Sequence, residues 1–449
     1  MCEPYLTEGW NFRYTNHTCK NNIYTPKFSK LSVVITKNYN LKLLYLINKQ
    51  KFAISGLFYD NPSQQKLSWK LPTSLVTLII GDNFNQQLVL PPLLETLILG
   101  NEFNQNIYLP PSIKTLIFGK RYNRETYFPA NLRYLKFGED YNQTTNLSEG
   151  TNQLIGLEFG NDYNSLVVLP NSLQILIFGE NYNLFTELPT SLRSVTFGSS
   201  YNQHTFIPTS LRRIKFSHCY KKFTSLPESL RHVTFGCRYN RLTDLPCFLE
   251  SLTFGQTYNT LTHLPGTLKT LIFGDHYNQL TNLPNSLQEL TFGADFNQNI
   301  TLSNSLVLLK FGHKYDQFTI FPDSIRKLTF GDKYNKPTIL PKLLSWLTFG
   351  CFYNQPTVLP YFLKGVIFGN CYSQTTYLPA LLEYVEIGIL FDTNLFDPNR
   401  LMNLYNCKIM TRLALSEPMK VYMQIKDFFV YTFLPILLIC WFHILCYVE

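Results

Sequence analysis

The cysteines and histidines of this 449-residue chain are its side chains best suited to metal or redox chemistry, so their spacing matters first. Ten cysteines are scattered along the sequence without a C-x-x-C pair. The nearest approach to a ligand set is His218 and Cys219 together with His232 and Cys237. A structural zinc site needs four ligands at characteristic short spacings, and this group lacks that pattern. The sequence therefore predicts no metal site, and mostly buried thiols in a reducing compartment.

Patterns for acid–base or nucleophilic catalysis are also missing. The chain has no Ser-His-Asp order, no phosphate-binding glycine loop and no H-E-x-x-H string. Paired carboxylates such as Glu139 and Asp140 follow a glycine, where solvated turn residues are common. A glycosidase that uses a pair of carboxylic acids is thus only a minor alternative for the function of this chain. We predict a protein that is not an enzyme and has no cofactor and no small-molecule substrate.

The cations are the remaining distinctive side chains. Lys and Arg number 39 against 30 Asp and Glu, for a formal charge of +9. Those that we predict to bind a partner lie in the middle of the chain: Arg193, Arg212, Arg213, Lys215, Arg231 and His232. Because guanidinium groups form paired hydrogen bonds with carboxylate and phosphate, the expected partner is an acidic or phosphorylated protein segment. The alternative is a solvated basic face, and nucleic acid is disfavoured because the charge is too sparse for a phosphate track.

A strict internal repeat must position these side chains. Its unit reads Leu-x-x-Leu-x-Phe-Gly-x-x-Tyr-Asn and closes with Leu-Pro, as in residues 252–278 (LTFGQTYNTLTHLPGTLKTLIFGDHYN). The glycine position recurs about 17 times from Gly81 to Gly388 in steps of 19 residues, with Ser217 at one such position and one step of 22 from Gly138 to Gly160. A period this strict predicts a solenoid whose units stack along one axis.

Within each unit the spacing favours a strand over a helix. Gly and Pro punctuate every unit, so a helix of about ten residues does not fit. The Leu-x-Phe segment has a period of two, which predicts a short strand with both large side chains inward. Parallel pairing would place Leu252 over Leu271 and Phe254 over Phe273, with units about 4.8 Å apart. About sixteen such steps predict a rod or shallow arc of roughly 75 to 80 Å.

Phe, Asn and Tyr recur in register and are expected to hold the stack together. The structural ladder includes Phe235, Phe254, Phe273, Asn240, Asn259 and Asn278. We expect the asparagines to point inward and to bond the backbone of their own turn and of the next. The Tyr column, which includes Tyr258 and Tyr277, is interpreted as core, and an exposed platform for sugars or bases is the alternative.

The unit resembles the FNIP repeat, a relative of the leucine-rich repeat that is abundant in social amoebae and in large viruses that infect amoebae. Stretches such as LPNSLQILIFGENYN (169–183) and LPNSLQELTFGADFN (283–297) carry the similarity, and the Phe-Asn pair occurs at 84–85, 103–104 and 296–297. The resemblance implies a β-rich, leucine-rich-repeat-like solenoid that acts as an interaction scaffold. Several relatives place an F-box ahead of the repeats, which implies an alternative role as a substrate adaptor of a ubiquitin ligase.

The extent of the repeats predicts the domain organisation. Residues 71–388 form the solenoid, residues 1–70 an N-terminal cap or a divergent F-box, and residues 389–427 a C-terminal cap and linker. Residues 428–448 (FFVYTFLPILLICWFHILCYV) carry no formal charge over a length close to the roughly 20 residues of a membrane-spanning helix. Basic residues precede this segment, so the positive-inside rule predicts a tail-anchored protein on the cytoplasmic face of a membrane, of the host cell if the chain is viral. A hydrophobic cap on the last repeat is the alternative.

Overall fold

The computed structural model describes residues 31–35, 54–59, 71–148, 150–151, 153–222, 225–388 and 408–411. Within these ranges the chain forms strands and turns but no helix. None of the described segments could therefore provide a membrane-crossing helix. The predicted N-terminal cap or F-box and the predicted C-terminal linker lie outside the described residues, apart from three strands named below. The apolar segment 428–448 lies outside them entirely.

One short strand per repeat builds the fold, because each Leu-x-Phe segment is long enough for only a few extended residues. The strands are β1 (Leu31–Ile35), β2 (Ile54–Tyr59), β3 (Thr77–Ile80), β4 (Thr96–Ile98), β5 (Thr115–Ile117), β6 (Tyr134–Lys136), β7 (Thr145–Asn146), β8 (Gly156–Glu158), β9 (Val167–Val168), β10 (Ile175–Ile177), β11 (Ser194–Thr196), β12 (Arg213–Lys215), β13 (His232–Thr234), β14 (Ser251–Thr253), β15 (Thr270–Ile272), β16 (Glu289–Thr291), β17 (Leu308–Lys310), β18 (Lys327–Thr329), β19 (Trp346–Thr348), β20 (Gly365–Ile367), β21 (Tyr384–Ile387) and β22 (Lys408–Thr411).

All strands except β7 and β9 form one parallel sheet of 20 strands, and β7 and β9 pair separately. Successive strands pair in register, so Val233 lies beside Leu252 and Leu252 beside Leu271. The fold is a parallel β-solenoid of about 17 turns of about 19 residues, as the repeat predicts.

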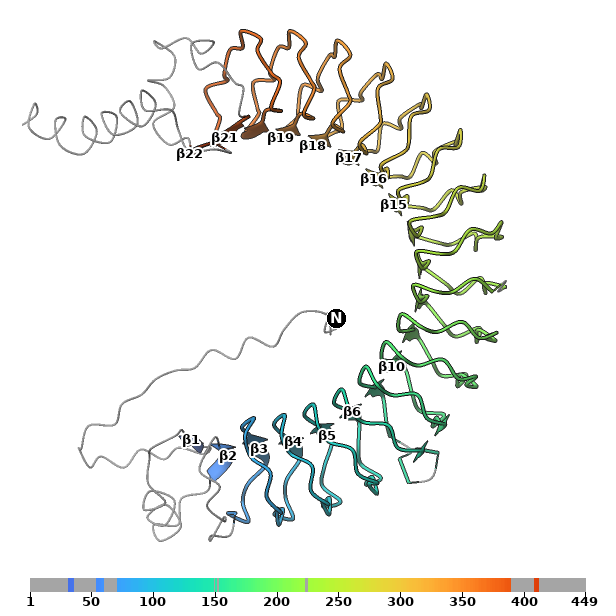
Figure 1. Ribbon diagram of the computed structural model, residues 1–449, viewed down its shortest axis with the longest axis vertical. Helices are drawn as coiled ribbons and strands as arrows, with labels where there is room; N and C mark the ends of the chain where they lie inside the picture. Colours follow the sequence, from blue (N-terminus) through green and yellow to red (C-terminus); the bar gives the residue numbers. More distant parts are fainter. Residues whose placement is uncertain are drawn as a thin grey trace, which may run out of the picture.

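The solenoid curves into an open ring, with the main sheet on the inside (Figure 1). This corrects the expected rod or shallow arc. Paired strands lie about 4.8 Å apart, whereas the ring centroids of Phe254 and Phe273 are 5.6 Å apart and those of Tyr258 and Tyr277 are 6.2 Å apart. Each turn is therefore wider at its aromatic layer than at the sheet. Such wedge-shaped turns add up to a ring, and the expectation based on strand spacing alone missed this.

The core is a set of ladders that run from turn to turn. Leu252, Phe254 and Tyr258 are all buried, and the Phe254 ring stacks on the Tyr258 ring of the same turn with centroids 3.9 Å apart. Phe235, Phe254 and Phe273 stack on one another in successive turns. The Tyr column thus belongs to the core and offers no exposed platform for sugars or bases.

The glycine after each Phe lets neighbouring backbones approach closely. A Cβ atom at Gly255 would lie 1.8 Å from the carbonyl oxygen of Gly236, a separation at which backbone atoms must move. Neither glycine has a positive φ, so close approach rather than an unusual conformation explains the residue type. Ser217 takes this position in one turn, where its hydroxyl is buried and donates to the carbonyl of Tyr201.

The asparagine ladder runs along the surface and does not point inward as expected. The Asn259 N–H donates to Asn240 Oδ1 at 3.0 Å, and the Asn278 N–H donates to Asn259 Oδ1 at 2.9 Å. Asn240 and Asn259 are exposed and Asn278 is half-buried. The short side chain reaches the next turn from the edge of the stack, so it satisfies a backbone N–H without being buried.

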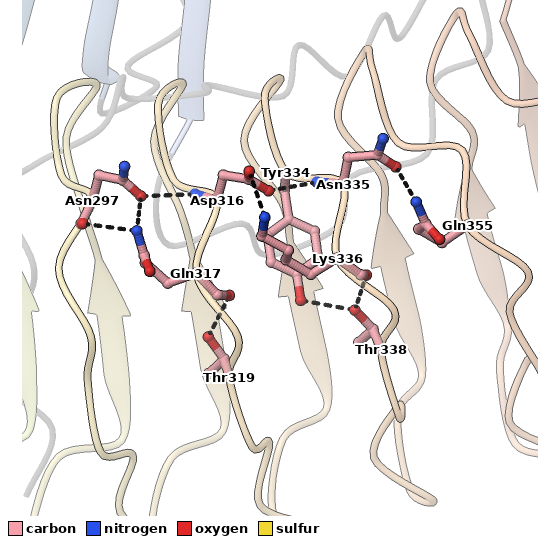
Figure 2. Close-up of polar contacts among 9 residues, drawn as sticks. All are labelled: Asn297, Asp316, Gln317, Thr319, Tyr334, Asn335, Lys336, Thr338 and Gln355. Carbon is pink, nitrogen blue, oxygen red and sulfur yellow. Dashed lines mark hydrogen bonds and ion pairs between the residues drawn. The ribbon is translucent and has the colours of Figure 1, made fainter.

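Figure 2 shows how this ladder accommodates a substitution. Asp316 takes the place of an asparagine, and its Oδ1 accepts from the N–H of Asn335 at 3.0 Å. Its other carboxylate oxygen forms an ion pair with Lys336 at 3.0 Å. Lys221, which replaces asparagine in another turn, has no acceptor to offer the next turn. The ladder is therefore interrupted after Lys221, in the turn that contains Ser217.

Candidate protein-binding surface on the inner sheet

The strands of the main sheet present alternate residues to the inside of the ring. In β11, β12 and β13 the middle residue (Val195, Ile214 or Val233) is buried in the core. The residues on either side of it are exposed or half-buried. This period of two converts the sequence repeat into a surface whose side chains change from one turn to the next.

The six residues predicted to bind a partner lie together on three adjacent turns. Arg213 pairs in register with His232, and Lys215 lies on the same strand as Arg213. Arg193, Arg212 and Arg231 form a second column just before the strands, in which the Arg212 N–H donates to the Arg193 carbonyl at 2.9 Å and the Arg231 N–H to the Arg212 carbonyl at 2.8 Å. We call these six residues the basic cluster. It lies on β11 to β13, between β10 and β15 and about midway along the arc (Figure 1).

Most of the cluster has no acidic partner. Arg193, Arg212, Arg213 and Lys215 are exposed, and none of these four forms an ion pair with another described residue. Some other cations of the same face are matched by an acid on a neighbouring turn, whereas Arg133, Lys310 and Lys327 are exposed and form no ion pair with a described residue. The matched pairs are Lys114–Glu95 at 2.7 Å, Lys136–Glu158 at 2.7 Å, Lys269–Glu250 at 3.0 Å and Lys364–Glu383 at 3.0 Å. The cluster is thus a stretch of the sheet where this pairing is missing.

Arg231 is more constrained than the other arginines of the cluster. Its Nη1 donates to the carbonyls of Glu228 and Ser229 at 3.0 and 3.1 Å, and its guanidinium lies 5.2 Å from the centre of the Phe248 ring. These contacts leave Arg231 fewer free donors. Arg231 therefore contributes charge at the border of the cluster, but its guanidinium is not free to form paired hydrogen bonds with a ligand.

His232 adds no charge to the cluster at neutral pH. The side chain is half-buried, and burial lowers the pKa of His232 below its usual range. The neighbouring Arg213 guanidinium lowers this pKa further, because a second positive charge is disfavoured beside it. The positive charge of the cluster at pH 7 therefore comes from its four arginines and Lys215.

The cysteines do not form a metal site in the part of the chain that the structure describes. No group of three or more His, Cys, Asp or Glu residues there is arranged to hold a metal ion. The expectation of buried thiols is wrong for the described cysteines. Cys219 and Cys237 are half-exposed free thiols, and Cys247 is exposed. Cys237 follows Gly236, and Cys219 follows Ser217, which takes the glycine position, by two residues. Both cysteines lie on turns at the edge of the stack.

One feature of the inner face was missed in the sequence. Trp346, Gly365 and Tyr384 pair in register on β19, β20 and β21, at the same repeat position as Arg213 and His232. A Cβ atom at Gly365 would lie 2.4 Å from Cε3 of Trp346, so the indole lies across the glycine. The rings of Trp346 and Tyr384 stack with centroids 5.5 Å apart. The signal in the sequence was two aromatic residues spaced by two repeat lengths around a glycine.

A curved parallel sheet with one strand per turn and a buried leucine ladder defines the class of leucine-rich-repeat-like solenoids. The family described as FNIP Repeat matches residues 64–102, 103–140, 165–200, 260–295 and 315–352. The chain therefore carries FNIP repeats at these five positions. These matches begin at residue 64, so they do not bear on the F-box alternative.

The solved structures that are similar to the chain include the following two. CroV588, from a giant virus and described as a novel circular LRR protein, aligns with a TM-score of 0.66 and 34% identity over 80% of this chain and 62% of that chain. This chain thus spans less than two thirds of the CroV588 chain. YopM from Yersinia enterocolitica WA-314 aligns with a TM-score of 0.45 and 18% identity over 73% of this chain and 90% of that chain. No protein with a curated description matches the sequence.

Proposed function

We propose that the chain is a non-enzymatic scaffold that binds a protein partner on the inside of its ring, and that the basic cluster contacts an acidic or phosphorylated segment of that partner. A repeat solenoid of this kind generally serves protein–protein interaction. The observation that carries the proposal is that four exposed cations without acidic partners, Arg193, Arg212, Arg213 and Lys215, lie together on adjacent turns of a face where several other cations are paired.

Electrostatics supports an acidic occupant. Like charges on adjacent turns repel by roughly 1 kcal/mol per pair or less in water, so the cluster does not help the fold. An anionic segment would remove this repulsion, and the guanidinium groups of Arg212 and Arg213 could each bond a carboxylate or phosphate through two N–H groups. A concave surface of one sign also attracts an oppositely charged partner from a distance.

We also propose that residues 428–448 attach the scaffold to the cytoplasmic face of a membrane. The support is the sequence alone, an uncharged segment of spanning length preceded by basic residues. Protease protection of the tail in microsomes would test this. A tail that is digested completely without detergent would overturn it.

The direct test of the cluster uses the full chain and two fluorescein-labelled peptides, one rich in Glu and one with several phosphoserines. Binding is followed by fluorescence anisotropy at low and at physiological ionic strength. The variant Arg212→Glu with Arg213→Glu should weaken binding at least about tenfold. The matched control is Arg238→Glu with Lys333→Glu, two exposed cations on turns outside the inner sheet. Equal weakening by both variants, or no binding to the native chain, would contradict the proposal.

Affinity capture from amoebal lysate with the same variants would then identify the partner. A protein that binds the native chain and the control but not the cluster variant is the expected result. The ubiquitin-ligase alternative predicts in addition that residues 1–70 recruit the linker subunit of such a ligase. Capture of that subunit independently of the cluster would favour the adaptor role.

A further inference from the structure

The geometry points to a second contact site on the inner sheet. We propose that Trp346 and Tyr384 form an anchor for an aromatic or large aliphatic side chain of the same acidic segment. This inference rests on the proposed function and names a further property of the partner. The site lies on β19, β20 and β21. These strands are nearer to the C-terminal end of the arc than the basic cluster is (Figure 1).

The aromatic pair is held in place before any partner binds. Gly365 has no side chain to separate the two rings, so Trp346 leans across it toward Tyr384. The Tyr384 hydroxyl donates to Glu386 at 3.0 Å, which orients its ring. Both aromatic side chains remain half-exposed on the inside of the ring. Such pre-positioned Trp and Tyr side chains lose little entropy on binding and are frequent anchors of protein interfaces.

Covering a glycine does not by itself require this pair. Tyr134 covers Gly156 in the same way, since a Cβ atom at Gly156 would lie 2.9 Å from Cδ1 of Tyr134. The strand on the far side of Gly156 presents Ile175 and no second ring. The addition of Tyr384 beyond Gly365 therefore creates a double aromatic surface that the glycine alone does not explain.

Unpaired cations lie on the strands between the anchor and the basic cluster. Lys327 pairs in register with Trp346, and Lys310 lies on the strand before Lys327. Both lysines are exposed, and neither forms an ion pair with a described residue. Glu289 is the one acid at the outward strand positions of β14 to β18. An acidic segment would thus meet cations at the basic cluster and again on β17 and β18, just before the anchor. The acids Glu383 and Glu386 lie on the far side of the anchor, where the segment presents its apolar residue.

The distance between the two sites limits the partner. Seven strand steps separate Arg213 on β12 from Trp346 on β19, which is about 34 Å at about 4.8 Å per step. An extended chain advances at most about 3.3 to 3.6 Å per residue, so about ten residues cover this distance. The expected ligand is an extended segment with an acidic run followed, about ten residues away, by one aromatic or large aliphatic residue.

Synthetic peptides and the full chain test this inference. One peptide carries about six Glu residues followed by a Gly/Ser spacer, a second carries Trp about ten residues after the acidic run, and a third carries Trp about three residues after it. The second peptide should bind about tenfold more tightly than the other two. Trp346→Ala should remove this increment, which is the about tenfold gain in affinity of the second peptide. It should leave the affinity of the Trp-free peptide unchanged.

Two further variants guard against a folding defect. Gly365→Ala keeps both rings, but its Cβ atom would lie 2.4 Å from Cε3 of Trp346 and must displace the indole, so it should reduce the same gain in affinity. Tyr134→Ala removes an aromatic residue that covers a glycine elsewhere on the inner sheet, and it should leave the increment intact. Thermal unfolding of each variant establishes that the solenoid is folded.

The outcomes separate this inference from the proposed function. If all three peptides bind equally tightly and Arg212→Glu with Arg213→Glu weakens them, the cluster binds acidic segments but the aromatic anchor is wrong. The anchor is also wrong if the increment persists in both Trp346→Ala and Gly365→Ala. If no peptide binds the native chain, both proposals fail.

Discussion

The hydroxyl groups of Tyr201 and Thr205 lie 2.6 Å apart inside the core, four residues apart in the chain. The same pairing recurs in many turns: Tyr122–Thr126, Tyr141–Thr145, Tyr182–Thr186, Tyr239–Thr243, Tyr258–Thr262, Tyr277–Thr281, Tyr315–Thr319, Tyr334–Thr338, Tyr353–Thr357 and Tyr372–Thr376. Where Phe replaces Tyr, the residue four positions on is aliphatic: Phe84 with Leu88, Phe103 with Ile107 and Phe296 with Ile300. The hydroxyls of these pairs are thus present or absent together, because a buried polar group without a partner is costly. Tyr163 is an exception, since Val167 lies four positions on and the Tyr163 hydroxyl donates instead to the carbonyl of Leu166 at 3.1 Å.

This pairing predicts a strong coupling between Tyr258 and Thr262. Thr262→Val should destabilise the solenoid by about 1 to 3 kcal/mol, because the Tyr258 hydroxyl loses its partner. Adding Tyr258→Phe should recover much of that loss, since the double variant copies the apolar pair at Phe296 and Ile300. Thermal and urea unfolding of the two single variants and the double variant measure the coupling. Purely additive losses would contradict the pairing.

The aromatic ladder predicts unequal costs for two neighbouring truncations. Phe254 is 3% exposed, whereas Thr253 is half-buried on the inside of the ring. Phe254→Ala should cost about 3 to 5 kcal/mol, because it leaves a cavity between stacked rings. Thr253→Ala should cost less than about 1 kcal/mol. Similar shifts in the unfolding midpoint would show that the assignment of inward and outward positions is wrong.

Close backbone approach predicts that Gly255 tolerates no side chain. The Cβ atom of Gly255→Ala would meet the carbonyl oxygen of Gly236 at 1.8 Å, so the turns must separate, and we expect a loss of about 3 kcal/mol or more. Gly266 is the matched control, because a Cβ atom there has nothing within 4 Å. Gly266→Ala should be neutral or stabilise by up to about 1 kcal/mol. If Gly255→Ala were tolerated as well as Gly266→Ala, the close approach of Gly255 to the Gly236 carbonyl would be refuted.

The buried tyrosines predict a specific alkaline limit of stability. Burial raises the pKa of Tyr201, Tyr258 and Tyr315 to about 12. In the unfolded chain the phenol has a pKa of about 10, so the folded state keeps its proton to higher pH. The associated stability is fully present below about pH 10 and is lost as the pH rises through about 12. Ultraviolet titration of tyrosinate should therefore coincide with the loss of the sheet signal in circular dichroism. Ionisation of these residues near pH 10 in a folded solenoid would contradict their burial.

Much of the fold was readable from the sequence, and the candidate surface was readable in part. The period of two in Leu-x-Phe correctly placed Leu252 over Leu271, and the Arg and Lys residues of the basic cluster were visible as a local excess of charge. The absence of acids opposite Arg212 and Arg213 was not visible, because it depends on which positions of neighbouring turns meet. The stacking of Trp346 on Tyr384 was not visible either. It depends on Gly365 in the intervening turn, and a glycine at a strand position carries no functional group that would mark a site.

By itself, the sequence determined the repeated turn, its strand and its buried Leu, Phe and Tyr ladders, because these follow from local spacing repeated in register. Only the tertiary structure decided the curvature, since the ring arises from a small difference in spacing between the sheet and the aromatic layer that accumulates over many turns. It also decided that the asparagines lie at the surface, where their short side chains reach the next backbone. The curvature, in turn, places the outward strand positions, including those of Arg213 and Trp346, on the inside of an open ring.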